Sequence, residues 1–230
     1  MGILNDFVSL FFPRYCLACA NSLVGGEDTL CTRCLVHLPK AHYGLTDNPV
    51  KDRLLGRLPL AYAGAFLQLK KGGIVQKMLH QLKYKHHPEI GVKLGKVYGH
   101  DLKRAGLNEA FDLIVPVPLH ASRLRKRGYN QSAKFAEGLG YVLGVPWDET
   151  ISVRKASTKT QTSKTKLERW ENVKGVFAVA QAEKIAGKRI LLVDDVITTG
   201  ATLEACGMHL VSNGCAQLSV ACIAEAQLGT

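Results

Sequence analysis

The sequence lacks any long apolar run that could cross a membrane. No stretch approaches the ~20 consecutive apolar residues that a spanning helix needs, although 47% of the 230 residues are hydrophobic. No basic residues precede the apolar N-terminal stretch, which argues against a secretory signal, and Asp6 stands where N-myristoylation requires Ser or Thr. We therefore expect a cytoplasmic protein without a transmembrane segment, which would reach the inner face of the membrane only through partners.

Two common nucleotide-binding motifs are also missing. The sequence has no G-x-x-x-x-G-K-[ST] motif, so a P-loop is excluded. Gly138-Leu-Gly140 resembles the start of a dinucleotide fingerprint, but Leu143 stands where the third glycine should be. We interpret residues 132–143 as a plain helix with small residues against a sheet.

Acidic residues are scarce. The chain has 30 Lys and Arg residues but only 19 Asp and Glu, which gives a formal net charge of +11. Residues 51–104 contain twelve basic and three acidic residues, and residues 113–134 contain five basic and no acidic ones. This imbalance favours polyanionic partners, such as pyrophosphate-bearing substrates or nucleic acid. A solvated basic face is the commoner explanation of such charge.

The first four cysteines form a metal-binding pattern. Cys16-Leu-Ala-Cys19 and Cys31-Thr-Arg-Cys34 are two C-x-x-C pairs separated by eleven residues, a spacing typical of one tetrahedral zinc site. Two disulfides are the alternative, which a reducing compartment disfavours. Four thiolates leave no open position for a water molecule, so the predicted site is structural. Buried thiols are expected at the remaining positions, Cys206, Cys215 and Cys222.

Residues 190–203, Ile-Leu-Leu-Val-Asp-Asp-Val-Ile-Thr-Thr-Gly-Ala-Thr-Leu, are the most informative stretch. The four apolar residues at 190–193 predict a strand buried on both faces, as in a parallel sheet. Asp194 and Asp195 follow, and then a turn rich in hydroxyl groups leads into a helix. Such a turn aims backbone N–H groups at one point, and the helix dipole favours negative charge there.

This arrangement suits a sugar phosphate. The carboxylates of Asp194 and Asp195 would repel a phosphate, so we expect them to accept hydrogen bonds from ribose hydroxyls while the turn holds the 5′-phosphate. The alternative is an ordinary strand–helix junction, with Thr as the N-cap and two solvated Asp residues.

A second strand is expected to end beside this site. Residues 111–118 predict a buried strand closed by two prolines, and a basic loop follows at 119–131. Ligands of open α/β sheets bind at the carboxyl ends of the strands, where guanidinium groups suit a pyrophosphate. A solvated basic turn is the alternative for any single arginine. The arginines of this loop are Arg123, Arg125 and Arg127.

The remaining segments complete an α/β pattern. Prolines and glycines punctuate residues 39–60, which predicts a linker. Residues 154–174 are polar, rich in Lys and Thr, and without apolar periodicity, so we expect a long loop that forms a lid or is disordered. Further strands are expected at 61–66, 175–179 and 217–224, and further helices at 74–86 and 89–102.

Taken together, these motifs resemble the ComF family. The resemblance rests on the four-cysteine knuckle, Pro116-Val-Pro118, Arg125-Lys-Arg-Gly-Tyr-Asn-Gln131, Arg154…Gln161…Arg169-x-x-Asn172-x-x-Gly175-x-Phe177 and residues 194–202, in the expected order over nearly the whole chain. It implies an α/β fold of the type I phosphoribosyltransferase kind, a mainly parallel sheet flanked by helices, with a small N-terminal zinc knuckle. The implied parts are an N-terminal helix and zinc finger at 1–40, a linker at 41–60 and a phosphoribosyltransferase-like domain at 61–230.

The resemblance also implies a substrate, partners and roles. The substrate would be 5-phosphoribosyl 1-pyrophosphate (PRPP) with Mg²⁺, in the chemistry of nucleoside metabolism. Family members are associated with the import of single-stranded DNA during natural transformation, alongside a helicase partner. The implied catalytic residues are Asp194, Asp195, Arg154 and Arg169. The implied PRPP-binding residues are the same two aspartates with Thr198, Thr199, Gly200, Ala201, Thr202, Arg123, Arg125 and Arg127.

Three functions are compatible with the sequence. The first is transfer of the phosphoribosyl group from PRPP through an oxocarbenium-like transition state, although too few residues follow the last expected strand to form a base-recognition segment. The second is a non-catalytic module that senses PRPP or nucleotides. The third is a single-stranded DNA binder that uses the zinc knuckle and residues 70–104. An amidophosphoribosyltransferase is not supported, because the chain has no N-terminal nucleophilic cysteine.

Overall fold

The computed structural model describes residues 13–41, 48–155 and 176–226. Its centre is a four-stranded sheet in the order β1-β6-β5-β2. The strands are β1 (Leu60–Leu69), β2 (Leu113–Pro116), β5 (Arg189–Ile197) and β6 (Gln217–Ala226). Every neighbouring pair in this sheet is parallel, so all four carboxyl ends lie at one edge. The expected parallel α/β sheet, with residues 61–66 in an edge strand, is confirmed.

Strand β5 shows why its apolar run is continuous. Leu191 and Val193 belong to the hydrophobic core on one face of the sheet, whereas Ile190 and Leu192 belong to the core on the other face. None of these four side chains is exposed to solvent. A strand covered on both faces needs apolar residues at every position, and this is the pattern of residues 190–193.

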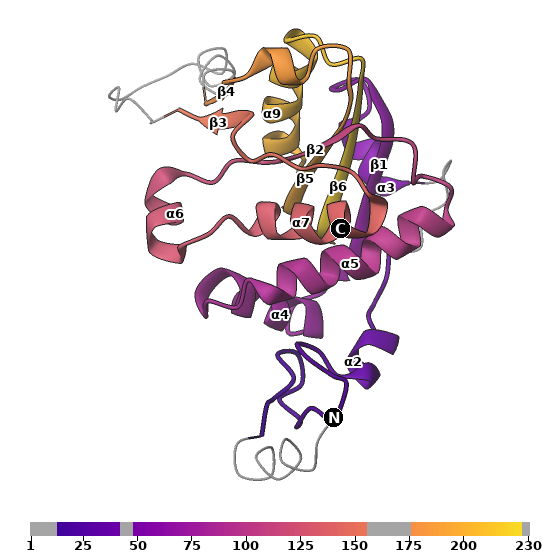
Figure 1. Cartoon of the computed structure of the whole chain (residues 1–230), viewed down its shortest axis with the longest axis vertical. Coiled ribbons are helices and arrows are strands. Elements are labelled where there is room, and N and C mark those ends of the chain that lie inside the picture. Colours follow the sequence, from indigo (N-terminus) through magenta and orange to yellow (C-terminus); the bar gives the residue numbers. More distant parts are fainter. Residues whose placement is uncertain (1–12, 42–47, 156–175, 227–230) are drawn as a thin grey trace.

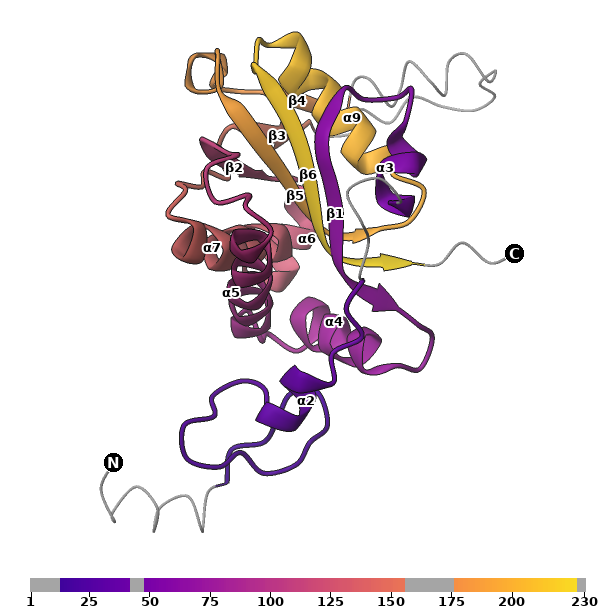
Figure 2. The same ribbon diagram turned by 90° about the vertical axis from the view of Figure 1, so that its right-hand side faces the viewer.

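Helices cover both faces of the sheet, as Figures 1 and 2 show. One face carries α4 (Ile74–Tyr84), α5 (Glu89–Arg104) and α7 (Gln131–Leu143), and the other carries α3 (Pro49–Leu54) and α9 (Ala201–Ser212). The shorter helical segments are α2 (Thr32–Val36), α6 (Ala121–Arg127) and the 3₁₀ turn η1 (Ala182–Lys184). Among the described helices, none has both the length and the apolar character needed to cross a membrane.

Helix α3 lies inside the stretch that the sequence pattern assigned to a linker at 41–60. The side chain of Asn48 caps the helix by accepting hydrogen bonds from two backbone N–H groups, at 3.0 and 3.3 Å. Pro49 occupies the first helical position, where its missing N–H is not needed. Val50 and Leu54 are fully buried against the sheet. This part of the stretch is therefore an ordered element of the domain, while the division into three parts stays a prediction.

Helix α6 replaces the basic loop expected after β2. His120 caps it by accepting from the N–H of Ser122 at 3.2 Å, and Gly128 ends it with a left-handed φ of 78°. No residue of the helix is buried, so the segment has no apolar stripe. Sequence periodicity detects helices through such a stripe, which explains why the prediction of a loop was wrong.

Strands β3 (Ser152–Arg154) and β4 (Phe177–Val179) form a separate antiparallel pair. The expected strand at 175–179 is thus present, but it does not join the central sheet. Arg154, the first residue of the loop predicted at 154–174, instead belongs to β3. Residues 156–174 of this loop, with Arg169, lie outside the described residues.

Helices α5 and α7 approach each other at glycines. A Cβ atom on Gly138 would lie 2.2 Å from the carbonyl oxygen of Val92, and one on Gly95 would lie 2.4 Å from that of Phe135. Both contacts are far shorter than side chains tolerate, so the close packing requires glycine. The expected helix at 132–143 is confirmed, but Gly138 faces α5 rather than the sheet.

Candidate functional site

A cavity of about 590 Å³ opens at the carboxyl ends of β2 and β5. Seven parts of the chain surround it: the end of α4, the turn after β2, helix α6, the N-terminus of α7, the end of β3, the end of β5 and the N-terminus of α9. Its lining includes Lys83, Tyr84, His86, Arg123, Lys126, Arg127, Gln131, Ser132, Arg154, Asp194, Asp195 and Thr202. The cavity therefore brings together basic and acidic side chains that lie more than a hundred residues apart in the sequence.

The two adjacent carboxylates lie at the end of β5, inside the strand. Asp194 Oδ1 accepts a hydrogen bond from the hydroxyl of Ser132 at 3.0 Å and one from the backbone N–H of Asp195 at 2.8 Å. Lys83 Nζ lies 2.9 Å from Asp195 Oδ2. Burial, followed by the charge of Asp195, raises the pKa of Asp194 to about 7. Near neutral pH, a fraction of the Asp194 carboxyl groups therefore remains protonated.

Three arginines also line the cavity, namely Arg123, Arg127 and Arg154. Burial lowers the pKa of Arg154, and the positive charge of Arg123 lowers it further. Two guanidinium groups that repel each other in a cavity are stabilised by an anion between them. Arg125, which the sequence placed in the same group, belongs to α6 but does not line the cavity.

The turn after β5 forms a second, smaller cavity of about 30 Å³. It is lined by every residue from Val196 to Leu203, and it shares Asp194, Val196 and Thr202 with the larger cavity. Gly200 caps helix α9 with a φ of 81°, a conformation that favours glycine. Among the described residues, the N–H groups of Thr199 and Gly200 have no protein acceptor. The turn can thus offer free N–H donors to an anion at the helix N-terminus.

Some lining residues were not singled out by the sequence. The side-chain amide of Gln131 is buried without a hydrogen-bond partner, and Ser132 holds Asp194. His86 has a φ of 57°, which is unusual for a residue with a side chain. Polar residues at the start of a helix are common, so the sequence pattern alone carried no signal for Gln131 and Ser132.

The four cysteines of the N-terminal knuckle converge as predicted. Their sulfur atoms all lie within 4.8 Å of one another, and Sγ of Cys19 is 3.8 Å from Sγ of Cys31. A zinc–sulfur tetrahedron with bonds of about 2.3 Å has edges of about 3.8 Å, so the arrangement fits one zinc ion. All four cysteines are free thiols rather than disulfides. The cluster can therefore bind a metal such as zinc.

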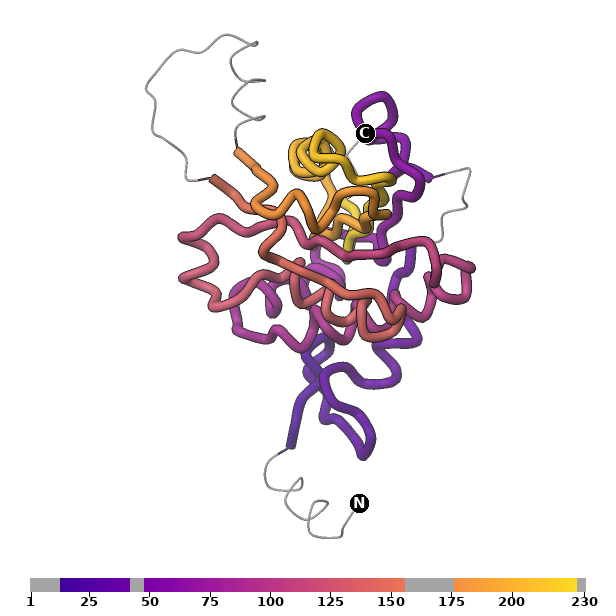
Figure 3. The backbone as a smooth tube through the Cα atoms, turned by 45° about the horizontal axis from the view of Figure 1, so that its top comes forward, coloured from indigo at the N-terminus to yellow at the C-terminus, as the bar shows by residue number. Residues whose placement is uncertain are grey.

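The knuckle packs against the domain rather than hanging free. Leu30 and Leu38 share a hydrophobic core with residues of α4 and α5, and Lys93 of α5 forms an ion pair with Asp28 at 2.8 Å. The tube view shows the knuckle, in indigo, at the end of the molecule opposite α9, in yellow (Figure 3). None of the four cysteines lines either cavity, which agrees with a structural role.

Comparison with known proteins agrees with this geometry. Residues 130–229 match the family model for the phosphoribosyl transferase domain. The chain is 33% identical over 150 residues to the DNA utilization protein YhgH of Escherichia coli, an alignment that covers 64% of this chain and 65% of that protein. It is 35% identical over 127 residues to competence protein F of Haemophilus influenzae, covering 55% of this chain and 56% of that protein.

These relatives support the resemblance to the ComF family. A further relative, competence protein ComFC of Bacillus subtilis, is 31% identical over 102 residues, covering 44% of this chain and 39% of that protein. The alignments thus span less than two thirds of the length of these relatives. The matched domain and the parallel sheet give this chain the type I phosphoribosyltransferase-like fold that the resemblance implied.

Solved structures with similar folds have low sequence identity. The glutamine PRPP amidotransferase of B. subtilis gives a TM-score of 0.45 at 17% identity, covering 63% of this chain and 30% of that chain. An adenine phosphoribosyltransferase gives a TM-score of 0.41 at 20% identity, covering 60% of this chain and 71% of that chain.

Proposed function

We propose that this protein binds PRPP with Mg²⁺ at the carboxyl edge of its sheet and transfers the phosphoribosyl group to an acceptor during DNA uptake. The observation that carries the proposal is the meeting of two carboxylates, three arginines and a turn with free N–H groups around two adjoining cavities. The names of the relatives support a role in DNA uptake. A helicase partner and a place on the cytoplasmic side of the membrane belong to the same proposal.

Each part of PRPP has a chemically matched partner in this site. The 5′-phosphate would accept hydrogen bonds from the turn at 198–202, and the ribose hydroxyls would donate to Asp194 and Asp195. The pyrophosphate would lie against Arg123, Arg127 and Arg154. Mg²⁺ would enter with PRPP, because pyrophosphate and carboxylate oxygens are the hard ligands it prefers, and it would neutralise charge on the pyrophosphate.

The reaction requires little covalent chemistry from the protein. The bond between C1′ and the pyrophosphate oxygen breaks, and pyrophosphate leaves with the electron pair. An acceptor bearing an N–H or O–H group forms the new bond to C1′ and loses a proton. The arginines stabilise the charge that develops on the leaving pyrophosphate, which is the main contribution expected of such a site. Arg154 is the described member of the two arginines predicted to be catalytic, and Arg169 lies outside the described residues.

Replacing both carboxylates tests the proposal. We expect Asp194→Asn combined with Asp195→Asn to weaken PRPP binding by about a hundredfold or more, because two charged acceptors for the ribose hydroxyls are lost. The measurement is calorimetric titration of Mg-PRPP into the zinc-loaded protein, with ribose 5-phosphate and AMP as comparison ligands. Selective binding of PRPP to the natural protein, weakened in the double variant, supports the proposal.

A matched control removes a carboxylate elsewhere. Asp148 forms a surface ion pair with Lys184 at 2.7 Å and does not line the cavity, so Asp148→Asn should bind PRPP normally. Equal affinity of the natural protein and the double variant would disprove the site assignment. Release of pyrophosphate with a panel of acceptors then separates a transferase from a protein that only senses PRPP or nucleotides.

A second candidate function, binding of single-stranded DNA, is favoured by helix α6. No residue of this helix is buried, and its Arg125 does not line the cavity proposed to bind PRPP. Backbone phosphates of DNA are bound by such exposed cations, and affinity then falls steeply with salt. We expect Arg125→Ala to weaken oligonucleotide binding without changing PRPP affinity. Binding that is insensitive to both salt and this substitution would count against α6 as a DNA contact.

A further inference from the structure

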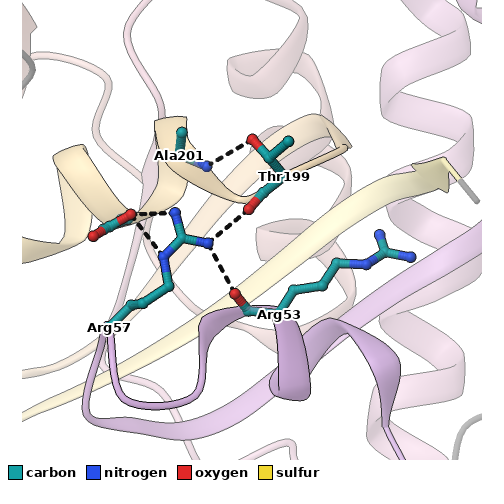
Figure 4. A network of polar contacts seen from close by, with 5 residues as sticks. Arg53, Arg57, Thr199 and Ala201 are labelled. Carbon is teal, nitrogen blue, oxygen red and sulfur yellow. Dashed lines mark hydrogen bonds and ion pairs between the residues drawn. The ribbon is translucent and has the colours of Figure 1, made fainter. Parts of the chain in front are cut away.

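Two arginines, Arg53 in α3 and Arg57 just after it, donate hydrogen bonds to backbone carbonyl groups of the turn at 198–202. We call this segment the phosphate turn, after its proposed role. Arg57 follows α3, and its Nη1 donates to the carbonyl oxygen of Thr199 at 2.7 Å and to that of Arg53 at 2.9 Å. Its Nε donates to Glu204 Oε2 on α9 at 2.8 Å, and its Nη2 pairs with the same oxygen. Figure 4 shows the guanidinium of Arg57 between the turn, helix α9 and α3.

Arg53 makes a similar bridge one residue earlier in the turn. Its Nη1 donates to the carbonyl oxygen of Thr198 at 3.4 Å, and its Nη2 lies 3.2 Å from Glu225 Oε2. Glu225 is only 1% exposed and lies beside Ile197 in the β5–β6 register, next to the start of the turn. Burial raises the pKa of Glu225.

These contacts determine the direction of the N–H groups on the inner side. A trans peptide unit is planar, and its C=O and N–H point in opposite directions. The described chain has no cis peptide bond. Because Arg53 and Arg57 hold the carbonyl groups of Thr198 and Thr199 outward, the N–H groups of Thr199 and Gly200 must point the other way. These are the N–H groups that have no protein acceptor among the described residues.

Helix α3 also contacts the turn through an apolar side chain. A Cβ atom on Gly200 would lie 2.7 Å from Cδ2 of Leu54, the buried last residue of α3. The helix therefore packs directly against the turn. This packing fixes the distance between the turn and the two arginines, Arg53 and Arg57.

We propose that Arg57, assisted by Arg53, positions the N–H groups that receive the 5′-phosphate. The inference rests on the proposed function of the site. Neither arginine lines either cavity, so both act through the turn rather than on the ligand. Helix α3 thereby becomes part of the PRPP site, although its residues precede the turn by more than 140 positions.

The test compares ligands that contact different ends of the site. We expect Arg57→Ala to weaken ribose 5-phosphate binding about tenfold, because a charge-assisted hydrogen bond that orients the turn is lost. Pyrophosphate affinity, which depends on the arginines that line the cavity, should stay unchanged. Arg57→Lys should recover part of the loss, since an ammonium group can still donate to one carbonyl oxygen. Titration calorimetry measures the affinity of ribose 5-phosphate, pyrophosphate and Mg-PRPP for Arg57→Ala, for Arg57→Lys and for the control variant described next.

Arg104→Ala is the matched control. Arg104 is an exposed arginine on α5 whose ion pair with Asp101 lies within one helix, so its removal should leave both affinities unchanged. Unchanged ribose 5-phosphate affinity in Arg57→Ala, or an equal loss for both ligands, would overturn the positioning role. If the natural protein bound neither PRPP nor ribose 5-phosphate, the proposed function would fail first and the positioning role with it.

Discussion

Purified protein is expected to contain about one zinc ion per chain, and removing it should unfold the N-terminal knuckle. Four thiolates close the coordination shell, and apart from the cysteines only Ala18, Leu30 and Leu38 are buried hydrophobic residues within 13–41. Such sites bind zinc with about 10–16 kcal/mol in isolated peptides. Cys31→Ser combined with Cys34→Ser removes two of the four ligands and should therefore abolish zinc binding. Metal analysis, together with limited proteolysis of residues 13–41, checks both results.

The control for the zinc prediction is a cysteine outside the cluster. Cys215 is half-buried and is not one of the four clustered thiols, so Cys215→Ser should retain zinc and protease resistance. The parallel sheet should stay folded in the double variant, because its four strands and the core on its α3 and α9 face contain no residue of the knuckle. Alkylation that finds two disulfides instead of four reactive thiols would contradict the zinc assignment.

Asp194→Asn is expected to stabilise the protein at pH 8 by about 3 kcal/mol, since a pKa shift of one unit corresponds to about 1.4 kcal/mol. The pKa of Asp194 rises from 3.8 to about 7 on folding, first through burial and then through the charge of Asp195. This stabilisation is smaller than the full pKa shift implies, because the amide oxygen of asparagine is a weaker acceptor than a carboxylate for the hydrogen bonds from Ser132 and Asp195.

The sign of the pH dependence follows from proton binding. Between pH 4 and 7 the folded protein keeps a proton on Asp194 that the unfolded chain releases, with pKa values of about 7 and 3.8. Stability therefore falls as pH rises through this window, and the loss is complete above pH 7. Asparagine does not titrate, so the advantage of the variant should be largest at pH 8 and should vanish near pH 4. Urea unfolding at several pH values measures the difference.

Asp112→Asn provides a control of opposite sign. Hydrogen bonds from Arg189 lower the pKa of Asp112 to about 2, so its stabilising effect is present above pH 4 and is lost as pH falls toward 2. The substitution should therefore reduce stability at pH 8. If Asp194→Asn also reduced the free energy of unfolding at pH 8, the prediction would be wrong, because the folded protein would then not disfavour the ionised form of Asp194. Unfavourable charges that persist in a native fold are typical of sites that bind a ligand.

Local patterns account for much of what the sequence predicted. The buried strand at 190–193, the helices at 74–86, 89–102 and 132–143, and the cysteine pairs each carry their signal within about a dozen residues. Their physical causes, apolar periodicity and ligand spacing, do not depend on the rest of the chain. These predictions were confirmed, except that the helix at 132–143 packs its glycine on α5.

Elements without a local signal were missed or misplaced. Helix α6 has no apolar stripe, because none of its residues is buried, and α3 is only six residues long. Asn48 and Pro49 do carry a helix-start signal, which the many prolines and glycines around them obscured. The pairing of β4 with β3 rather than with the central sheet depends on contacts between distant segments, which periodicity cannot reveal.

The sequence by itself determined which side chains the proposed site can use, namely the two carboxylates, the arginines and the hydroxyl-rich turn after β5, and which four cysteines can bind a metal. The tertiary structure alone decided which of them meet. It brought Arg154 into the cavity, left Arg125 outside it, and joined Ser132 to Asp194 and Arg57 to the phosphate turn. The reason is physical, because residue type and spacing act within one element, whereas these contacts arise only when parallel strands align their carboxyl ends at one edge.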